Sequence, residues 1–310
     1  NSEIVKIPSR ILLRNGQTPQ AFKRSVIKAA YEKALLDPLF KTTDDCGVVL
    51  KYLPDESIYV VNGEQFNMKL TYKEDIFLLD KLFQLRSIRN QPTLLVKSDI
   101  EELHGKVVVV FGGTYGIGQE ICEICREYKT TLYVYSRSTG VDVSNSQSVR
   151  RVLSEIYEKE GRIDWIVNTA GILDKQPLAN MSYEVVHRSI DINYLGNIIV
   201  AKESFSYLKE SKGSLLFFTS SSYTRGRALY SLYSSSKAAI VNFVQALSEE
   251  WFEYDIRVNC INPERTKTPM RIQNFGNEPE DTLLEPKVVA IVSVNTLLSE
   301  MTGEVVDVKR

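Results

Sequence analysis

Residues 107–118 read VVVVFGGTYGIG, and this stretch decides the fold of the C-terminal part of the chain. Its four valines and phenylalanine form a continuous apolar run, as expected of a central parallel strand that is buried on both faces. A glycine-rich turn follows the run, and residues 119–128 have the pattern of a helix. A glycine motif alone is weak evidence, but a strand before it and a helix after it give it the context of a dinucleotide site. The stretch therefore predicts an α/β fold with a doubly wound parallel sheet.

The three glycines have separate roles in this interpretation. Gly112 permits a tight turn, Gly116 lets the backbone approach a pyrophosphate, and Gly118 allows the helix to pack closely on the strand. The helix N-terminus offers unpaired N–H groups and the positive end of its dipole to the phosphates. Tyr115 and Ile117 lie between the glycines and are predicted to contact the same cofactor.

The next apolar run, residues 131–135, ends in Ser136-Arg137-Ser138. An acidic residue at this point accepts a hydrogen bond from the ribose of NAD, whereas an arginine suits the 2′-phosphate of NADP. Arg137 therefore favours NADP, with NAD as the less favoured cofactor. An exposed arginine that merely ends a strand is the alternative interpretation.

Two further segments are expected to complete the cofactor site. Asp142 and Val143 follow the turn after Arg137, and Asp142 could accept a hydrogen bond from the adenine amino group. Another predicted strand ends in Asn168-Thr169-Ala170-Gly171. Asn168 could tie adjacent strands together beside the cofactor, and Ala170 and Gly171 would line it.

Tyr233 and Lys237 are four residues apart, so on a helix they point from one face. Reducing a ketone places negative charge on its oxygen, so a proton donor must sit on that oxygen. Tyrosine titrates near about 10, and a lysine cation beside it, together with a cationic nicotinamide, lowers that pKa. Ser220 ends the apolar run 214–219 and could donate to the developing oxyanion, with Ser221 as the alternative. Tyrosine–lysine pairs are common on helix surfaces, so this one gains its meaning from its neighbours.

Residues 98–310 resemble the short-chain dehydrogenase/reductase family, whose motifs occur here in order. The matching residues are Gly112, Gly116 and Gly118, then 168–171, Asn193, Ser220, Tyr233 with Lys237, Pro263, and 302–306. The resemblance implies a Rossmann-type fold and a nicotinamide-dependent reductase whose proton donor is Tyr233. It also implies that Lys237 bonds the nicotinamide ribose, that Asn193 holds a water returning protons toward Lys237, and that Pro263 lies beside the cofactor. Long helices around Asn193 and Tyr233 form oligomer contacts in that family, which implies a homodimer or homotetramer.

Three positions depart from the family pattern. Thr169 replaces the second asparagine of its motif. Phe111 stands where a threonine is usual before the glycines, which removes one local hydrogen bond. Glu264 stands where a glycine usually follows Pro263, in the loop after a strand predicted at 256–261, and it adds bulk and charge near the cofactor.

Residues 1–97 form a separate predicted domain, with helices at 20–36 and 73–88 and a strand at 57–61. They resemble the C-terminal part of the sugar-phosphate cytidylyltransferases through QTPQAF at 17–22, TDD at 43–45, Gly63, NMKLT at 67–71 and Glu74-Asp75. The resemblance implies that Arg14 and Lys69 hold a phosphorylated substrate, and exposed surface charges are the alternative. No glycine-rich basic loop for CTP precedes Arg14. We therefore expect a fragment or a reduced domain, without cytidylyltransferase activity from this chain alone.

The order of the two parts resembles the bifunctional CDP-ribitol-forming enzymes of bacterial capsule synthesis. It implies that NADPH reduces ribulose 5-phosphate to ribitol 5-phosphate, which the full-length protein joins to CMP from CTP. Basic residues that could hold the phosphate are Arg225, Arg227 and Arg265, with Lys175, Lys267 and Arg271 in the same loops. A reductase of another small ketone, and a non-catalytic dinucleotide-binding module, are the alternatives.

The composition of the chain argues against several classes of partner. A formal net charge of −1 gives no electrostatic footprint for nucleic acid or an anionic membrane, and no apolar run is long enough to span a bilayer. Four cysteines are too few and too irregularly spaced for a disulfide scaffold, and they indicate a cytoplasmic setting. Cys122 and Cys125 spell C-x-x-C, but we interpret them as two small buried helix residues rather than metal or redox ligands. No metal is therefore expected.

Overall fold

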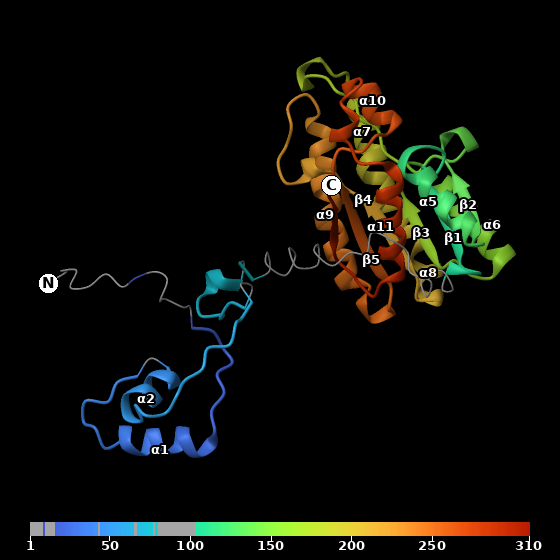
Figure 1. Cartoon of the computed structure of the whole chain (residues 1–310). Helices are drawn as coiled ribbons and strands as arrows, with labels where there is room; N and C mark the ends of the chain where they lie inside the picture. The colour runs from blue at the N-terminus through green and yellow to red at the C-terminus, as the bar shows by residue number, and fades with distance from the viewer. Residues whose placement is uncertain (1–8, 10–15, 43, 65–66, 77, 80–102) are drawn as a thin grey trace. The chain divides into compact units, whose positions relative to one another are not determined.

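The structure is a computed structural model that describes residues 9, 16–42, 44–64, 67–76, 78–79 and 103–310. The chain divides into two units, Asn1–Leu85 and Arg86–Arg310, and each is described here by itself (Figure 1). The predicted domain boundary at residues 97 and 98 lies outside the described residues and stays a prediction.

A six-stranded sheet forms the centre of the C-terminal unit, with strand order β2-β1-β3-β4-β5-β6. Every neighbouring pair is parallel. The strands are β1 (Val107–Phe111), β2 (Thr131–Tyr135), β3 (Trp165–Asn168), β4 (Ser214–Phe218), β5 (Arg257–Pro263) and β6 (Val305–Val308). The predicted doubly wound parallel sheet is confirmed, and the strand runs predicted at 107–111 and 131–135 have the observed bounds.

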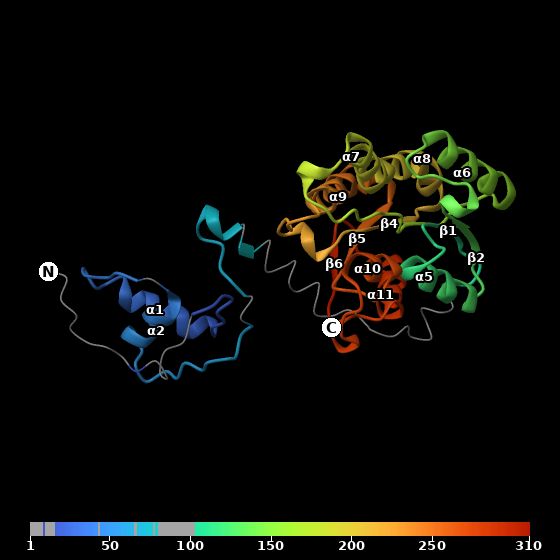
Figure 2. The same ribbon diagram turned by 90° about the horizontal axis from the view of Figure 1, so that it is seen from above.

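Helices cover both faces of this sheet (Figures 1 and 2). One face carries α6 (Ser146–Glu160), α8 (Gly196–Ser211) and α9 (Ser231–Glu250), and the other carries α5 (Gly116–Glu127) and α11 (Pro286–Leu298). The shorter helices α7 (Tyr183–Ile190) and α10 (Pro269–Phe275) lie in the loops at the carboxyl ends of the strands.

The first strand shows why the sequence requires two helical layers. Val107, Val109 and Phe111 belong to the core beneath α6, α8 and α9, whereas Val108 and Val110 belong to the core beneath α5 and α11. Successive strand residues point to opposite faces, so a strand that is apolar at every position must be covered on both sides. All five residues are at most 3% exposed.

The strand order reverses at β1, because β2 adds to one side of it and β3 to the other. In open α/β sheets, ligands bind in the crevice outside the carboxyl ends of the strands at such a switch point. The glycine turn after β1 and the segment after β3 therefore lie at the place where a ligand is expected.

Two helices form the core of the described N-terminal unit, α1 (Arg24–Ala34) and α2 (Asp45–Tyr52). The helix predicted at 20–36 is confirmed with shorter ends. The helix predicted at 73–88 is helical at the described residues 73–76 and 78–79, and its remainder lies outside them. The strand predicted at 57–61 is wrong, because these residues form no ladder with another described segment and Tyr59 and Val61 are 86% and 87% exposed.

Candidate active site

The glycine turn after β1 contains two positions, Gly112 and Gly118, at which a side chain would clash with neighbouring backbone. Gly112 has φ +79°, and a Cβ there would come within 2.6 Å of the Ala170 backbone nitrogen. A Cβ on Gly118 would come within 2.5 Å of the Gly112 carbonyl oxygen, so α5 approaches β1 as closely as glycine permits. Gly116 also has a positive φ, of +63°, but a Cβ there would meet only the side chain of Thr268 at 3.4 Å and Pro269 beyond it. The turn thus leaves backbone open to a ligand.

Two departures from the family pattern contact each other. The Phe111 carbonyl accepts hydrogen bonds from the Thr169 backbone N–H at 2.9 Å and from Thr169 Oγ1 at 3.0 Å. The Phe111 ring is fully buried and stacks against Tyr135, with ring centroids 6.0 Å apart. Thr169 therefore supplies a local hydrogen bond at the point where phenylalanine was expected to remove one.

A cavity of about 660 Å³ opens at the carboxyl ends of β1 to β5. This volume lies within the range of small-molecule and cofactor sites. Most of the residues that the sequence predicted for the site line it, namely Gly112, Tyr115, Gly116, Ile117, Gly118, Arg137, Asp142, Val143, Ala170, Gly171, Ser220, Tyr233, Lys237, Pro263 and Arg265. Asn168 and Asn193 are buried behind the lining, and Arg225 and Arg227 are exposed and do not line it.

The β2 end of the cavity is polar and basic. Arg137 begins a short turn, and the hydroxyls of Ser136 and Ser138 beside it lie 2.6 Å apart. Thr114 Oγ1 is buried at the glycine turn and has no hydrogen-bond partner among the described residues. Asp142 accepts from the Ser144 N–H and hydroxyl through Oδ1. An unpaired hydroxyl, an arginine and an open glycine turn fit the phosphates and riboses of a dinucleotide.

Asn168 acts differently from the prediction. Its Nδ2 donates to Asn197 Oδ1 of α8 at 2.9 Å, and its Oδ1 accepts from the Ala170 N–H at 3.1 Å. The side chain thus ties the end of β3 to a helix and to its own turn, and not to an adjacent strand. The prediction of a strand-to-strand link is wrong because the strand partner of Asn168 is Phe111, an apolar residue whose carbonyl is already bonded to Thr169.

Helix α9 brings the proton-transfer residues to the end of β4. Lys237 Nζ donates to the Phe218 carbonyl at 2.8 Å, and Thr219 Oγ1 donates to the Lys237 carbonyl at 2.7 Å, so helix and strand are joined twice. Ser220 is hydrogen-bonded to Tyr233. Ser221 is exposed, so the geometry favours Ser220 over Ser221 as the partner of Tyr233.

Burial sets the protonation of both groups. It raises the pKa of Tyr233 to about 12, although the Ser220 hydrogen bond and the charge of Arg271 oppose this. It lowers the pKa of Lys237 to about 8. The expected lowering of the Tyr233 pKa by Lys237 is not found among the described residues, since desolvation of the phenolate outweighs the attraction of nearby cations. Tyr233 is therefore a protonated donor at neutral pH.

Asn193 clamps the loop that follows β3. Its Nδ2 donates to the Ile172 carbonyl and its Oδ1 accepts from the Ile172 N–H, both at 2.9 Å. The residue lies in a π-helical turn between α7 and α8. Gly171 separates this clamp from the cavity, because a Cβ there would lie 3.2 Å from Asn193 Oδ1 and 3.9 Å from Lys237 Nζ. The predicted water relay through Asn193 stays a prediction.

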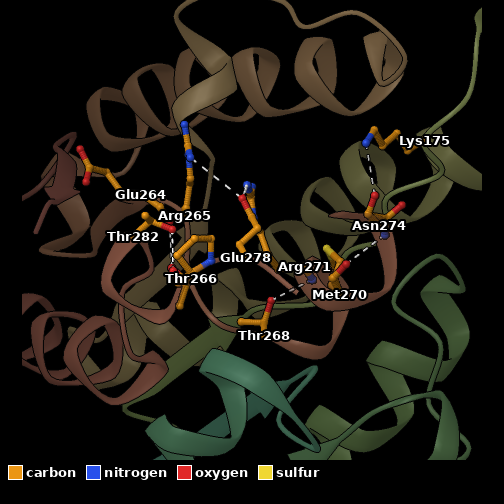
Figure 3. A network of polar contacts seen from close by, with 11 residues as sticks. Lys175, Glu264, Arg265, Thr266, Thr268, Met270, Arg271, Asn274, Glu278 and Thr282 are labelled. Carbon is orange, nitrogen blue, oxygen red and sulfur yellow. Dashed lines mark hydrogen bonds and ion pairs between the residues drawn. The ribbon is translucent and has the colours of Figure 1, made fainter. Parts of the chain in front are cut away.

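Charged residues that the sequence interpretation did not single out either line the cavity or, like Glu278, bond a residue that lines it. Arg188 donates to Asp174 Oδ1 at 2.9 Å, and both line the cavity. Glu278 bonds Arg271 on the segment after β5 (Figure 3). These pairs are far apart in sequence or lie in an irregular loop, so no periodicity could have shown them.

The Glu264 carboxylate is directed away from Arg265 and Arg271 (Figure 3). Its Oε2 accepts from the Arg310 backbone N–H at 3.4 Å. Glu264 nevertheless lines the cavity, so the residue does add bulk beside Pro263.

Cys122 and Cys125 are fully buried in α5, within the core that α5 and α11 share. Burial raises the pKa of the two thiols to about 12 and about 11. Their interpretation as small core residues is confirmed. The described residues contain no group of three or more His, Cys, Asp or Glu side chains placed to hold a metal ion.

The N-terminal motifs contact one another. Gln17 Nε2 donates to the Glu64 carbonyl at 2.9 Å, and Asn67 Nδ2 donates to the Thr18 carbonyl at 2.7 Å. Asp44 caps α2 by accepting from the Gly47 N–H at 2.8 Å. Lys69 is exposed, and Arg14 lies outside the described residues. Their predicted role in holding a phosphorylated substrate stays a prediction.

None of the helices in the described part of the chain is both long and apolar enough to cross a membrane.

Family comparisons match the two parts separately. Residues 138–279 match the family described as short chain dehydrogenase, and residues 1–84 match 2-C-methyl-D-erythritol 4-phosphate cytidylyltransferase. A bifunctional ribulose 5-phosphate reductase/CDP-ribitol pyrophosphorylase of Haemophilus influenzae is 48% identical over 306 residues, which are 99% of this chain. The chain spans 64% of that relative's length.

Two further proteins are similar to part of the chain. An acetoacetyl-CoA reductase of Acinetobacter sp. (strain RA3849) is 32% identical over 53% of this chain and 76% of its own length. Among solved structures, a 3-ketoacyl-(acyl-carrier-protein) reductase of Brucella melitensis complexed with NADH is similar at a TM-score of 0.62. It covers 66% of this chain and 97% of its own, at 21% identity, and this likeness concerns the fold.

Proposed function

This chain belongs to the short chain dehydrogenase family, and from that premise we propose that it reduces ribulose 5-phosphate to ribitol 5-phosphate with NADPH. The observation that carries the proposal is the trio of Ser220, Tyr233 and the buried Lys237 at the end of a cavity that begins at a dinucleotide-type glycine turn. The relative of Haemophilus influenzae that spans both parts of the chain supports the choice of substrate.

Each member of the trio has a separate task in this mechanism. Tyr233, protonated at neutral pH, gives its proton to the carbonyl oxygen as charge develops there. Ser220 shares a hydrogen bond with Tyr233 and can donate to the same oxygen. Lys237 keeps a positive charge beside the site below pH about 8 and is oriented by the Phe218 carbonyl. Bound NADPH supplies the hydride.

An assay of NADPH oxidation with ribulose 5-phosphate tests the substrate. We expect turnover that depends on the sugar phosphate and yields ribitol 5-phosphate, identified by mass spectrometry. Turnover of other small ketones without turnover of ribulose 5-phosphate would show that the chain is a reductase but that ribulose 5-phosphate is not its substrate. Dinucleotide binding without turnover of any ketone would favour a non-catalytic module.

The preference for NADPH rests on Arg137, which lines the β2 end of the cavity. We expect Arg137→Ala to lower kcat/KM for NADPH by about 10- to 100-fold, the effect of losing one charge-assisted phosphate contact, with little change for NADH. Arg126→Ala is the matched control, because Arg126 is an exposed arginine of α5 paired with Glu123. An equal loss of kcat/KM with NADPH and with NADH would mean that Arg137 stabilises the turn and does not contact the 2′-phosphate.

The proposal extends to the full-length protein, in which ribitol 5-phosphate would be joined to CMP to give CDP-ribitol for capsule or another cell-surface polysaccharide. The cytidylyltransferase match at residues 1–84 supports this second step. We propose a cytoplasmic homo-oligomer, since its substrates are phosphorylated metabolites and other members of the family associate.

A further inference from the structure

Two arginines lie against one carboxylate, Glu278, on the segment that follows β5, and a lysine of the loop after β3 is near enough for its charge to affect that carboxylate. Arg271 Nε and Nη2 donate to Glu278 Oε2 and Oε1 at 2.6 and 2.8 Å. Arg265 Nη1 lies 4.0 Å from Glu278 Oε1 (Figure 3). The charges of Arg271, Arg265 and Lys175 all lower the pKa of Glu278, and the Arg271 hydrogen bonds do so most. One carboxylate thus balances only part of the positive charge.

Lys175 is held in this group by an aromatic ring. Its Nζ donates to the Asn274 carbonyl at 3.3 Å and lies 4.3 Å from the centroid of Phe275. Arg271 Cζ lies 4.0 Å from the centroid of the same ring. Phe275 therefore positions two cations that come from the loop after β3 and from α10.

This cluster lies close to the proton donor. Phe275 contacts Tyr230 edge to face with centroids 6.0 Å apart, and Tyr230 contacts Tyr233 in the same way at 6.4 Å. The charge of Arg271 also lowers the pKa of Tyr233. A small sugar phosphate carries its phosphate only a few bonds from its carbonyl, so its anion site must lie near Tyr233, as this one does.

The other ion pair at the cavity is a weaker candidate. Arg188 is paired with Asp174 at 2.9 Å, one cation to one carboxylate, so no positive charge is left over. Asp174 Oδ2 is buried and has no hydrogen-bond partner among the described residues, which makes that corner an acceptor of hydroxyl groups and not a receptor of anions. The cations near Glu278 therefore outnumber the carboxylates there, whereas Arg188 and Asp174 balance each other.

We propose that Arg265, Arg271 and Lys175 form the phosphate subsite of the reductase, and that Glu278 occupies it until the substrate phosphate displaces it. This inference rests on the proposed function, because it assumes a phosphorylated ketone. Arginine offers the same planar donor edge to a carboxylate and to a phosphate. A phosphate carries about two negative charges and three acceptor oxygens, so it can balance more of this positive charge than Glu278, which among the described residues makes hydrogen bonds only with Arg271.

Three variants of the full chain test the subsite through one quantity, the ratio of kcat/KM for ribulose 5-phosphate to that for ribulose at saturating NADPH. Arg271→Met keeps an apolar stem on Phe275 and is expected to lower the ratio at least about tenfold. Glu278→Gln removes the internal competitor and is expected to raise the ratio about threefold through a lower KM for the phosphate ester. Glu280→Gln is the matched control, because it breaks the Lys267–Glu280 pair of the same segment outside the cavity lining, and it is expected to leave the ratio unchanged.

The outcomes separate this inference from the proposed function. If Arg271→Met reduces ribulose 5-phosphate with an unchanged ratio of the two kcat/KM values, the proposed phosphate subsite is wrong and the proposed function stands. A higher KM for the phosphate ester in Glu278→Gln overturns the displacement and makes Glu278 a positioning residue for Arg271. Turnover of ribulose without turnover of its phosphate overturns the proposed function.

Inorganic phosphate tests the subsite without any ketone. With NADPH saturating, so that the cofactor's own phosphate sites are filled, phosphate is expected to raise the Tm of the wild-type chain. The concentration needed should fall in Glu278→Gln and rise in Arg271→Met. Equal phosphate dependence in the three proteins would overturn the proposal even if no ketose is reduced.

Discussion

Tyr233→Phe is expected to lower kcat/KM for ketone reduction by about a thousandfold, within the range that general acid catalysis contributes. The change removes only the hydroxyl that bonds Ser220 and keeps the ring that contacts Tyr230. The fold should therefore persist, and the loss should appear as a lower rate of NADPH oxidation with an unaltered circular dichroism spectrum.

Tyr223→Phe provides the matched control. Tyr223 is another half-buried tyrosine, whose pKa is also raised by burial, and it does not line the cavity. Its variant should keep the wild-type rate within about twofold. A Tyr233→Phe enzyme that retained a tenth of the wild-type activity would require another proton donor, and Ser220 would be the first to examine.

The direction of the reaction should affect the pH profile. Because the pKa of Tyr233 is raised to about 12, the phenol is protonated throughout the neutral range and is ready to donate in the reducing direction. Oxidation of the alcohol needs the phenolate, so the rate of oxidation is expected to rise with pH, whereas the rate of reduction is expected to stay level through the neutral range.

The parallel sheet could be predicted because the sequence of each strand shows whether one or both of its faces are buried. An unbroken run such as Val107 to Phe111 has no polar face to expose, and a glycine turn with φ +79° at Gly112 accepts no other residue. Tyr233 and Lys237 could be paired because helical spacing fixes their direction. These features depend on neighbours within a few residues, which a sequence displays.

The remaining features of the site depend on contacts between distant segments. Glu278 meets Lys175 only after β3 and the segment following β5 reach the same edge of the sheet, and the spacing of 103 positions carries no signal. Thr169 compensates for Phe111 through a bond between two strand ends. The exposed run at 57–61 failed as a strand for the same reason, since a β-branched pattern forms a ladder only where a partner strand is present.

Lys237→Met is expected to abolish most activity while making the chain more stable at pH 7. The side chain is 5% exposed, and burial lowers its pKa from 10.5 to about 8. Between these values the unfolded chain binds more protons than the folded chain, so the stability of the wild type rises with pH through this window. Below pH 8 the folded state holds a charge that burial disfavours, at a cost of about 3 kcal/mol.

Methionine removes that cost but also the hydrogen bond to the Phe218 carbonyl, which is worth about 1 kcal/mol. We therefore expect the variant to be more stable than the wild type by about 2 kcal/mol at pH 7, and less stable by about 0.5 kcal/mol near pH 10.5, where the lysine is neutral in the folded chain and half protonated in the unfolded chain. Urea unfolding at the two pH values measures the reversal. Lys202→Met, at an exposed position of α8, should show no such change with pH.

A difference in stability that stays constant with pH would contradict the lowered pKa of Lys237 and would leave only packing to explain it. A reversal, combined with loss of turnover, would mean that the chain keeps a destabilising buried cation next to Tyr233. Stability alone would favour an apolar side chain at this position, so the charge must be retained for what it does to the reacting groups. The two measurements together therefore separate the catalytic role of Lys237 from its contribution to the fold.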